Sequence, residues 1–131
     1  MKKFICVLII MTGLFWDPLH LQAQQSPEML EDALYSVLFP QINRAIEKHY
    51  GTLKKYDCPK IVHMKKMYSG TYMFEAKIEV IKYEGRMDEP PGPPFDRVTI
   101  TFNNEEGEWT VQHVSVQRLP DSTELNCRKP M

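Results

Sequence analysis

Residues 26–51 read SPEMLEDALYSVLFPQINRAIEKHYG, and this stretch decides the fold because it predicts one long amphipathic helix. Ser26 can cap the helix N-terminus, Pro27 suits the first turn, and Gly51 can end the helix in a left-handed conformation. Pro40 removes a backbone hydrogen bond midway, so we expect a kink there. Apolar residues recur at gaps of one, three or four and form one stripe, made of Leu30, Ala33, Leu34, Val37, Leu38, Ile42, Ala45, Ile46 and Tyr50.

A stripe of this length needs a partner surface, and the residues that follow predict a sheet because the apolar period changes from 3.6 to 2. Strands are expected over residues 60–68, 72–80, 98–102 and 109–116. The apolar parity slips near Gln112 and His113, which predicts a β-bulge. The fold class is therefore α+β, with one long kinked N-terminal helix packed against a curled four-stranded antiparallel sheet.

The connection over residues 84–96 contains the run Pro90-Pro91-Gly92-Pro93-Pro94. Proline donates no ladder hydrogen bond, so we expect this run outside the sheet or at its edge. It could present a polyproline II ligand to an aromatic groove. A rigid connection between strands explains the same residues.

The N-terminus has the order of a secretory signal peptide: Lys2 and Lys3, an apolar stretch over residues 4–16, and a polar run ending at Ala23. The apolar stretch is shorter than the roughly 20 residues that span a bilayer. We expect cleavage after Ala23, no transmembrane segment afterwards, and a protein that is secreted or associated with the cell envelope. Residues 24–131 then form a single α+β domain with a short flexible C-terminal tail from about residue 120.

Composition excludes binding driven by bulk positive charge. The chain of 131 residues has 16 Lys and Arg against 17 Asp and Glu, a net charge of −1. Proteins that bind nucleic acids through phosphate contacts carry an excess of positive charge, so no nucleic-acid partner is expected.

Two cysteines, Cys58 and Cys127, remain when Cys6 leaves with the signal peptide. An exported chain meets an oxidising environment, which makes these two a disulfide candidate. The bond would close a loop of about 70 residues and stabilise the fold by roughly 4 kcal/mol. The alternative is a pair of free thiols.

Several blocks of the sequence resemble a known family. They read QSPEMLEDAL at 25–34, LFP at 38–40, IEKHYG at 46–51, YD at 56–57 and PGPPFDRVTITF at 91–102. They are similar to short exported proteins of Bacillus-type bacteria that are grouped as a domain of unknown function. The resemblance implies export and one small domain, and it carries no activity or catalytic residue. The order of helix and sheet is also similar to cystatin-like and nuclear-transport-factor-like folds, an analogy that assigns no function.

No nucleophile, phosphate-binding or metal-binding motif is present in the sequence, so no catalytic residue, metal or cofactor is predicted. The sequence favours a non-enzymatic module that binds a partner at the cell envelope or exterior. Apolar residues on the sheet could line a ligand space against the helix: Tyr72, Phe74, Ile100, Phe102 and Trp109. The alternative is a small acid-base enzyme at the open end of the sheet, with the candidates His63, His113, Glu75 and Tyr72.

A basic segment gives a second possible binding surface, made of Lys54, Lys55, Lys60, Lys65 and Lys66. It could meet an envelope protein, an anionic cell-wall polymer or lipid headgroups. The alternative is an edge strand that its lysines protect against aggregation.

Overall fold

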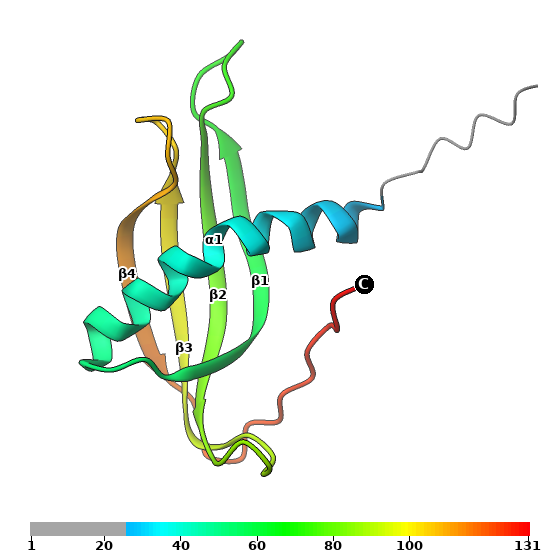
Figure 1. Ribbon diagram of the computed structural model, residues 1–131, viewed down its shortest axis with the longest axis vertical. Coiled ribbons are helices and arrows are strands. Elements are labelled where there is room, and N and C mark those ends of the chain that lie inside the picture. The colour runs from blue at the N-terminus through cyan, green and yellow to red at the C-terminus, as the bar shows by residue number, and fades with distance from the viewer. Residues whose placement is uncertain (1–25) are drawn as a thin grey trace, which may run out of the picture.

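A computed structural model of the chain describes residues 26–131, and the predicted signal peptide lies outside them. The elements are α1 (Pro27–Tyr50), β1 (Lys55–Lys66), β2 (Phe74–Glu84), β3 (Gly92–Asn103) and β4 (Thr110–Arg118). The strands form one antiparallel sheet in the order β1-β2-β3-β4, and α1 crosses one face of it (Figure 1). The predicted α+β fold is confirmed. Within residues 26–131 no helix is long and apolar enough to cross a membrane.

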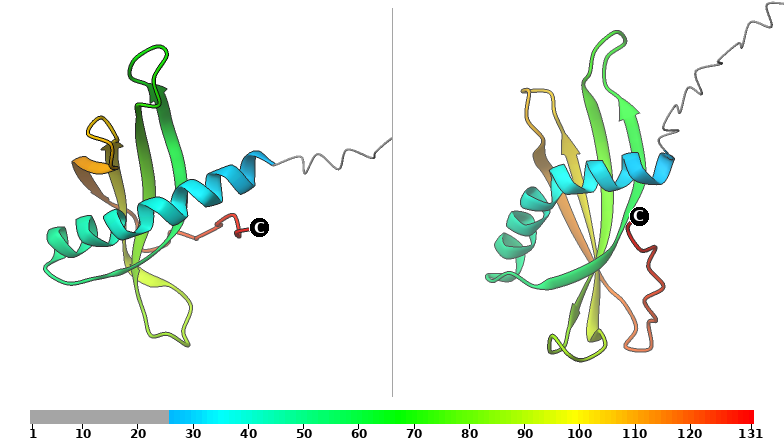
Figure 2. Two further views of the ribbon diagram at one scale, coloured as in Figure 1. Left: turned by 45° about the horizontal axis from the view of Figure 1, so that its top comes forward. Right: turned by 45° about the vertical axis from the view of Figure 1, so that its right-hand side comes forward.

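Helix α1 begins and ends where the sequence predicts. The Ser26 side chain accepts a 3.2 Å hydrogen bond from the Met29 N–H, and Gly51 ends the helix with φ 76°. Pro40 lies inside one continuous helix, whose axis bends along its length (Figure 2).

The core lies between α1 and the two central strands. Alternate residues of β2 and β3 face the helix, as a strand period of 2 requires. The core side chains are at most 7% exposed and comprise Tyr35, Leu38, Ile42, Ala45, Ile46, Ala76, Ile78, Val80, Val98, Ile100 and Phe102. Burying each large apolar side chain contributes about 1.5–3 kcal/mol, so this layer is the main source of stability.

Two edge strands contain bulges. In β1 the pairs Asp57 with Ile81 and Lys60 with Glu79 leave Cys58 and Pro59 opposite the single residue Val80. In β4 the register shift leaves Gln112 without a ladder partner, which confirms the predicted bulge. A bulge bends its strand and re-aims the neighbouring side chains.

The proline run is placed differently from the prediction. Strand β3 begins at Gly92, so Pro93 and Pro94 lie inside an internal strand, and the expectation that the run stays outside the sheet is wrong. Glu84 pairs with Gly92 and Lys82 pairs with Asp96, so three residues of β3 lie opposite one residue of β2. This irregularity lets prolines enter the strand, because the ladder needs no N–H from them there.

Residues 119–131, hereafter the C-terminal segment, run from the end of β4 around the lower end of the sheet to α1 (Figures 1 and 2). The segment has no helix or strand. The Leu119 N–H donates a 2.9 Å hydrogen bond to the Phe95 carbonyl, and a disulfide joins Cys127 to Cys58 in β1. The chain therefore ends against the N-terminal half of α1.

Candidate functional site

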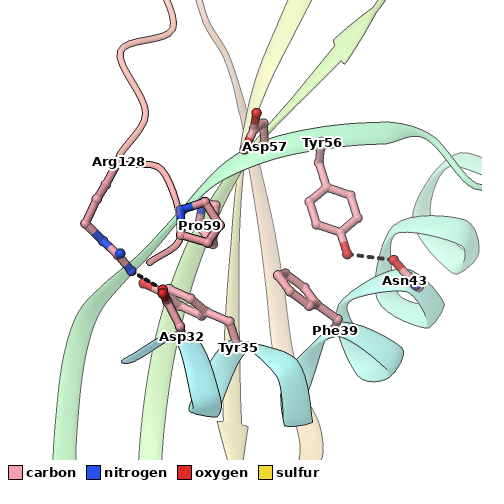
Figure 3. Close-up of a pocket in the computed structure, with 9 residues that line it drawn as sticks. Asp32, Tyr35, Phe39, Asn43, Tyr56, Asp57, Pro59 and Arg128 are labelled. Atoms are coloured by element: carbon pink, nitrogen blue, oxygen red, sulfur yellow. Dashed lines mark hydrogen bonds and ion pairs between the residues drawn. The ribbon is translucent and has the colours of Figure 1, made fainter. Parts of the chain in front are cut away.

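A pocket of about 450 Å³ lies between α1, β1 and the C-terminal segment (Figure 3). Its lining residues are Asp32, Tyr35, Phe39, Asn43, Tyr56, Asp57, Pro59, Arg128 and Pro130. We call it the aromatic pocket. Its volume falls in the range of about 300–1,000 Å³ that is usual for small-molecule sites.

Three distant parts of the chain build this pocket. Residues 32, 35, 39 and 43 of α1 follow one another at gaps of three or four, which places them on one flank of the helix. Residues 56–59 come from the start of β1, where the bulge turns the strand. Arg128 and Pro130 come from the C-terminal segment. The pocket therefore depends on the tertiary fold.

Aromatic rings form the wall of the pocket. The ring of Phe39 lies between those of Tyr35 and Tyr56, with centroid distances of 6.3 Å to each and interplanar angles of 30° and 46° (Figure 3). Tyr35 is 2% exposed, whereas Phe39 is 36% exposed. The pocket thus combines a fixed aromatic base with one ring open to solvent.

Hydrogen bonds fix the two tyrosines. The Tyr56 hydroxyl donates a 2.6 Å bond to Asn43 Oδ1 (Figure 3). The Tyr35 hydroxyl donates to Glu31 and accepts a 3.0 Å bond from the Ile61 N–H. Burial raises the pKa of both phenols, that of Tyr56 to about 12, so both hydroxyls stay protonated at neutral pH.

An ion pair closes one end of the pocket. Arg128 bonds the Asp32 carboxylate, and the Met131 N–H donates a 2.9 Å bond to the same side chain. The hydrogen bond from Arg128 is the main reason why the pKa of Asp32 lies below its ordinary value. These contacts attach the C-terminal segment to α1.

The Cys58–Cys127 disulfide holds this wall in place. The sequence left a bond and two free thiols as alternatives, and the structure contains the bond, with a Cα–Cα distance of 4.7 Å. Cys58 has φ 57°, and its N–H donates a 2.7 Å hydrogen bond to Oδ1 of the neighbouring Asp57. Arg128 follows Cys127 directly, so the bond brings the pocket's basic residue to its position.

The residues predicted to line a ligand space are not brought together. Ile100 and Phe102 are fully buried in the core, and Tyr72 is 91% exposed in the turn before β2. Phe74 is partly buried under Lys66, whose Nζ lies 5.8 Å from the ring centroid. Trp109 packs against the core and borders a separate shallow hollow.

The lysines of the predicted basic surface are divided between different environments. Lys54 Nζ lies 3.2 Å from Glu84, and Lys65 Nζ lies 3.1 Å from Glu75. Lys55 donates a 2.6 Å bond to the Gly85 carbonyl. Lys60 pairs with Glu79 on the outer face of the sheet, whereas Lys66 lies on the helix side, over Phe74.

The residues of the acid-base alternative stay apart. Ladder pairs connect His63 to Lys77, Lys77 to Thr101, and Thr101 to His113 in one row across the sheet. Three strand spacings of about 4.8 Å separate the two histidines, or about 14 Å. In residues 26–131 no three His, Cys, Asp or Glu side chains come together in a way that could hold a metal ion.

A second polar cluster lies under the C-terminal end of α1. Lys82 and Asp96 have side chains 4% and 3% exposed, with 3.8 Å between Nζ and Oδ2. Lys82 also lies 2.8 Å from Glu84, Arg118 lies 2.5 Å from Asp96, and the Tyr50 hydroxyl bonds Asp96. Every buried side-chain polar atom in residues 26–131 has a partner. This cluster is satisfied internally and does not border the aromatic pocket.

The sequence contained a partial signal for the aromatic pocket. Tyr35 and Phe39 are four residues apart beside the apolar stripe, and helical spacing places them together. Their partners Tyr56 and Arg128 could be found only by assuming the disulfide and the path of the C-terminal segment. The sequence pattern therefore did not predict the pocket, although it could have predicted that the helical residues lie on one flank.

Comparison with known proteins identifies the family of the chain. No curated protein and no solved structure matches the chain. The family described as "Protein of unknown function (DUF3888)" matches residues 30–116, which include most of α1 and most of the sheet. The match supports the resemblance to a domain of unknown function. The chain belongs to the DUF3888 family of proteins of unknown function.

Proposed function

We propose that the protein is exported and acts as a non-enzymatic binding module at the cell envelope or exterior, with its ligand in the aromatic pocket. The observation that carries this proposal is the convergence of three aromatic rings and two prolines from three distant segments. A fold needs only a filled core, which this chain has elsewhere. A pocket of this size with a few oriented polar groups is the usual form of a ligand site.

The chemistry of the lining indicates a ligand with a flat or ring-shaped apolar group. Aromatic faces pack against such groups by stacking and dispersion. Asn43 uses its oxygen for Tyr56, which leaves its amide nitrogen as a donor for a ligand, and exposed Asp57 offers carboxylate oxygen. A ring that carries hydrogen-bonding substituents, or the proline of an extended peptide, fits this combination.

Export is supported by the sequence of residues 1–23 and by the cysteine pair. A disulfide persists in an oxidising compartment and is rare in the cytosol. The Cys58–Cys127 bond also holds the pocket wall, so the same bond supports both the ligand site and the proposed export. The location is tested by measuring the intact mass of the protein recovered outside the cells. The mass should correspond to a chain that begins near Gln24, and the protein should have no reactive thiol.

The binding role is tested with a library of ring-containing ligands, including proline-rich peptides and wall saccharides, measured by calorimetry. Phe39→Ala should weaken any ligand of the pocket at least about tenfold, because it removes the ring between Tyr35 and Tyr56. Val37→Ala is the matched control, since Val37 is 58% exposed on another flank of the same helix. Equal affinity for Phe39→Ala and Val37→Ala would place the ligand elsewhere and reject the proposal.

A further inference from the structure

A second hollow, of about 610 Å³, lies between the C-terminal half of α1 and β4. Figure 1 shows that half of the helix crossing the strand. The hollow is lined by apolar, basic and amide side chains. They are Gln41, Arg44, Ala45, Lys48, His49, Val111, Gln112, His113 and Val114. We call it the basic groove.

The groove carries positive charge without a counter-charge. Among the residues of 26–131 that line it there is no Asp or Glu. Lys54 and Lys65, by contrast, each lie within 3.2 Å of a glutamate oxygen. In the described chain neither Arg44 nor Lys48 has a carboxylate oxygen within 4.0 Å, so their head groups remain free for an anion.

Stabilisation of the helix terminus explains only part of this cluster. Cations at the C-terminal turn of a helix interact favourably with its dipole, which accounts for Lys48 and His49. Arg44 lies one turn earlier, and Gln112 and His113 come from the bulge of β4. The bulge frees Gln112 from the ladder, but its amide nitrogen already donates to Asn103 Oδ1 and Thr110 Oγ1, so the cationic groups of α1 are the ones left to bind an anion in this groove.

We propose that the basic groove binds phosphate groups of a linear polyanion. Arg44 and Lys48 are one turn apart, about 6 Å along the helix axis, so they can contact successive anionic groups of a chain. Guanidinium and ammonium groups are the usual partners of phosphate in proteins. The whole chain has a net charge of −1, so attraction must come from this local site. The proposal is independent of the aromatic pocket, which lies on a different flank of α1.

The test uses inorganic polyphosphate and the full chain with its disulfide formed, with affinity measured by calorimetry at several salt concentrations. Substitution of both cations, Arg44→Gln with Lys48→Gln, should weaken binding about thirtyfold. The slope of log affinity against log salt should become shallower by roughly 1.4, because two phosphate contacts are lost from a flexible chain. Both side chains are exposed and Gln forms helix well, so the variant should fold.

The matched control is Lys77→Gln with Arg86→Gln, which removes the same two residue types from exposed positions outside the groove. It should leave affinity within about twofold, since distant exposed charges are screened by salt. Equal weakening of both double variants would show attraction without a site and would overturn the proposal.

Vesicles of phosphatidylglycerol distinguish the two sources of phosphate. Binding to polyphosphate alone identifies a soluble or wall polymer, and binding to vesicles alone identifies lipid headgroups. Polyphosphate binding that the Arg44 and Lys48 substitutions abolish supports the proposal, whereas binding to vesicles alone would show that the groove recognises lipid headgroups and would overturn the assignment to a linear polyanion. Absence of wild-type binding to both probes at low salt would contradict the proposal.

Discussion

Tyr50, the last residue of α1, donates a 2.8 Å hydrogen bond from its hydroxyl to Oδ2 of Asp96 in β3. Lys82 Nζ lies 3.8 Å from the same oxygen, and Arg118 bonds the other carboxylate oxygen. Asp96 thereby connects the helix end to two strands beside its own. The carboxylate holds the C-terminal half of α1 over the sheet from a position where only 3% of its side chain is exposed.

Removing Asp96 should destabilise the fold more than removing its partner hydroxyl. Asp96→Ala leaves Lys82 with Glu84 as its one remaining carboxylate partner in the cluster and should lower the free energy of unfolding by about 3–5 kcal/mol. Tyr50→Phe deletes one hydrogen bond to a charged group and should cost about 1.5–3 kcal/mol. Urea denaturation monitored by circular dichroism gives both values. A loss below 1 kcal/mol for Asp96→Ala would show that the cluster does not hold the helix.

The same carboxylate should make stability fall in acid. Burial alone raises the pKa of Asp96, but hydrogen bonds from Tyr50 and Arg118 outweigh it and hold the pKa below the ordinary 3.8. The unfolded chain therefore takes up the proton more readily, so this stabilisation is complete above about pH 4 and is lost as pH falls through the folded pKa. Glu84 acts with the same sign, since its hydrogen bond from Lys82 lowers its pKa.

Denaturation curves from pH 6 down to pH 2 measure this effect. The wild type should lose stability steeply below about pH 4, and Asp96→Asn should show a shallower decline because it has no proton to take up. An equally steep decline in the variant would assign the acid sensitivity to other carboxylates.

Truncating a buried side chain of the sheet should lower the free energy of unfolding much more than truncating an exposed side chain. Ile100 is fully buried, so Ile100→Ala should lower the free energy of unfolding by about 2–5 kcal/mol. Tyr72 is 91% exposed, and Tyr72→Ala should change it by less than about 0.5 kcal/mol. Paired denaturation experiments check the contrast. Similar losses at both sites would mean that Tyr72 packs against the domain in solution.

Loss of the disulfide should weaken the fold and detach the pocket wall. The Cys58–Cys127 bond joins residues 69 positions apart, and the chain-entropy model assigns such a loop about 4 kcal/mol. The double substitution of both cysteines by serine should lower stability by up to that amount. Amide hydrogen exchange should also accelerate over residues 119–131 while the β2–β3 core stays protected.

Unchanged exchange in the C-terminal segment of this variant would show that Arg128, Met131 and Leu119 hold it without the bond. The matched control is the oxidised wild type, which has the same segment with the bond intact.

Local sequence rules predicted the helix and the bulge of β4. Ser26 and Gly51 define the helix ends through their own backbone preferences, so no distant contact is needed to locate them. The bulge at Gln112 was visible because the apolar parity changes within one strand. The prolines were misplaced because the rule assumes a regular ladder, whereas three residues of β3 lie opposite one residue of β2.

The binding sites were harder to predict from the sequence because they are formed by segments that meet only in the folded structure. Lys65 and Lys66 are neighbours in sequence, yet the strand places one beside Glu75 and the other over Phe74. Arg128 reaches Asp32 across 96 positions through the disulfide. Arg44 and His113 line one groove although no period of the sequence connects them.

The binding role of the aromatic pocket is tested most directly by a two-dimensional NMR titration of the oxidised protein with ring-containing ligands. A ligand of the pocket should shift the signals of Tyr35, Phe39 and Tyr56 together, saturate with concentration, and lose this effect in Phe39→Ala. A library whose binders shift only residues outside the pocket, with these three rings unchanged, would contradict a ligand-binding role for it.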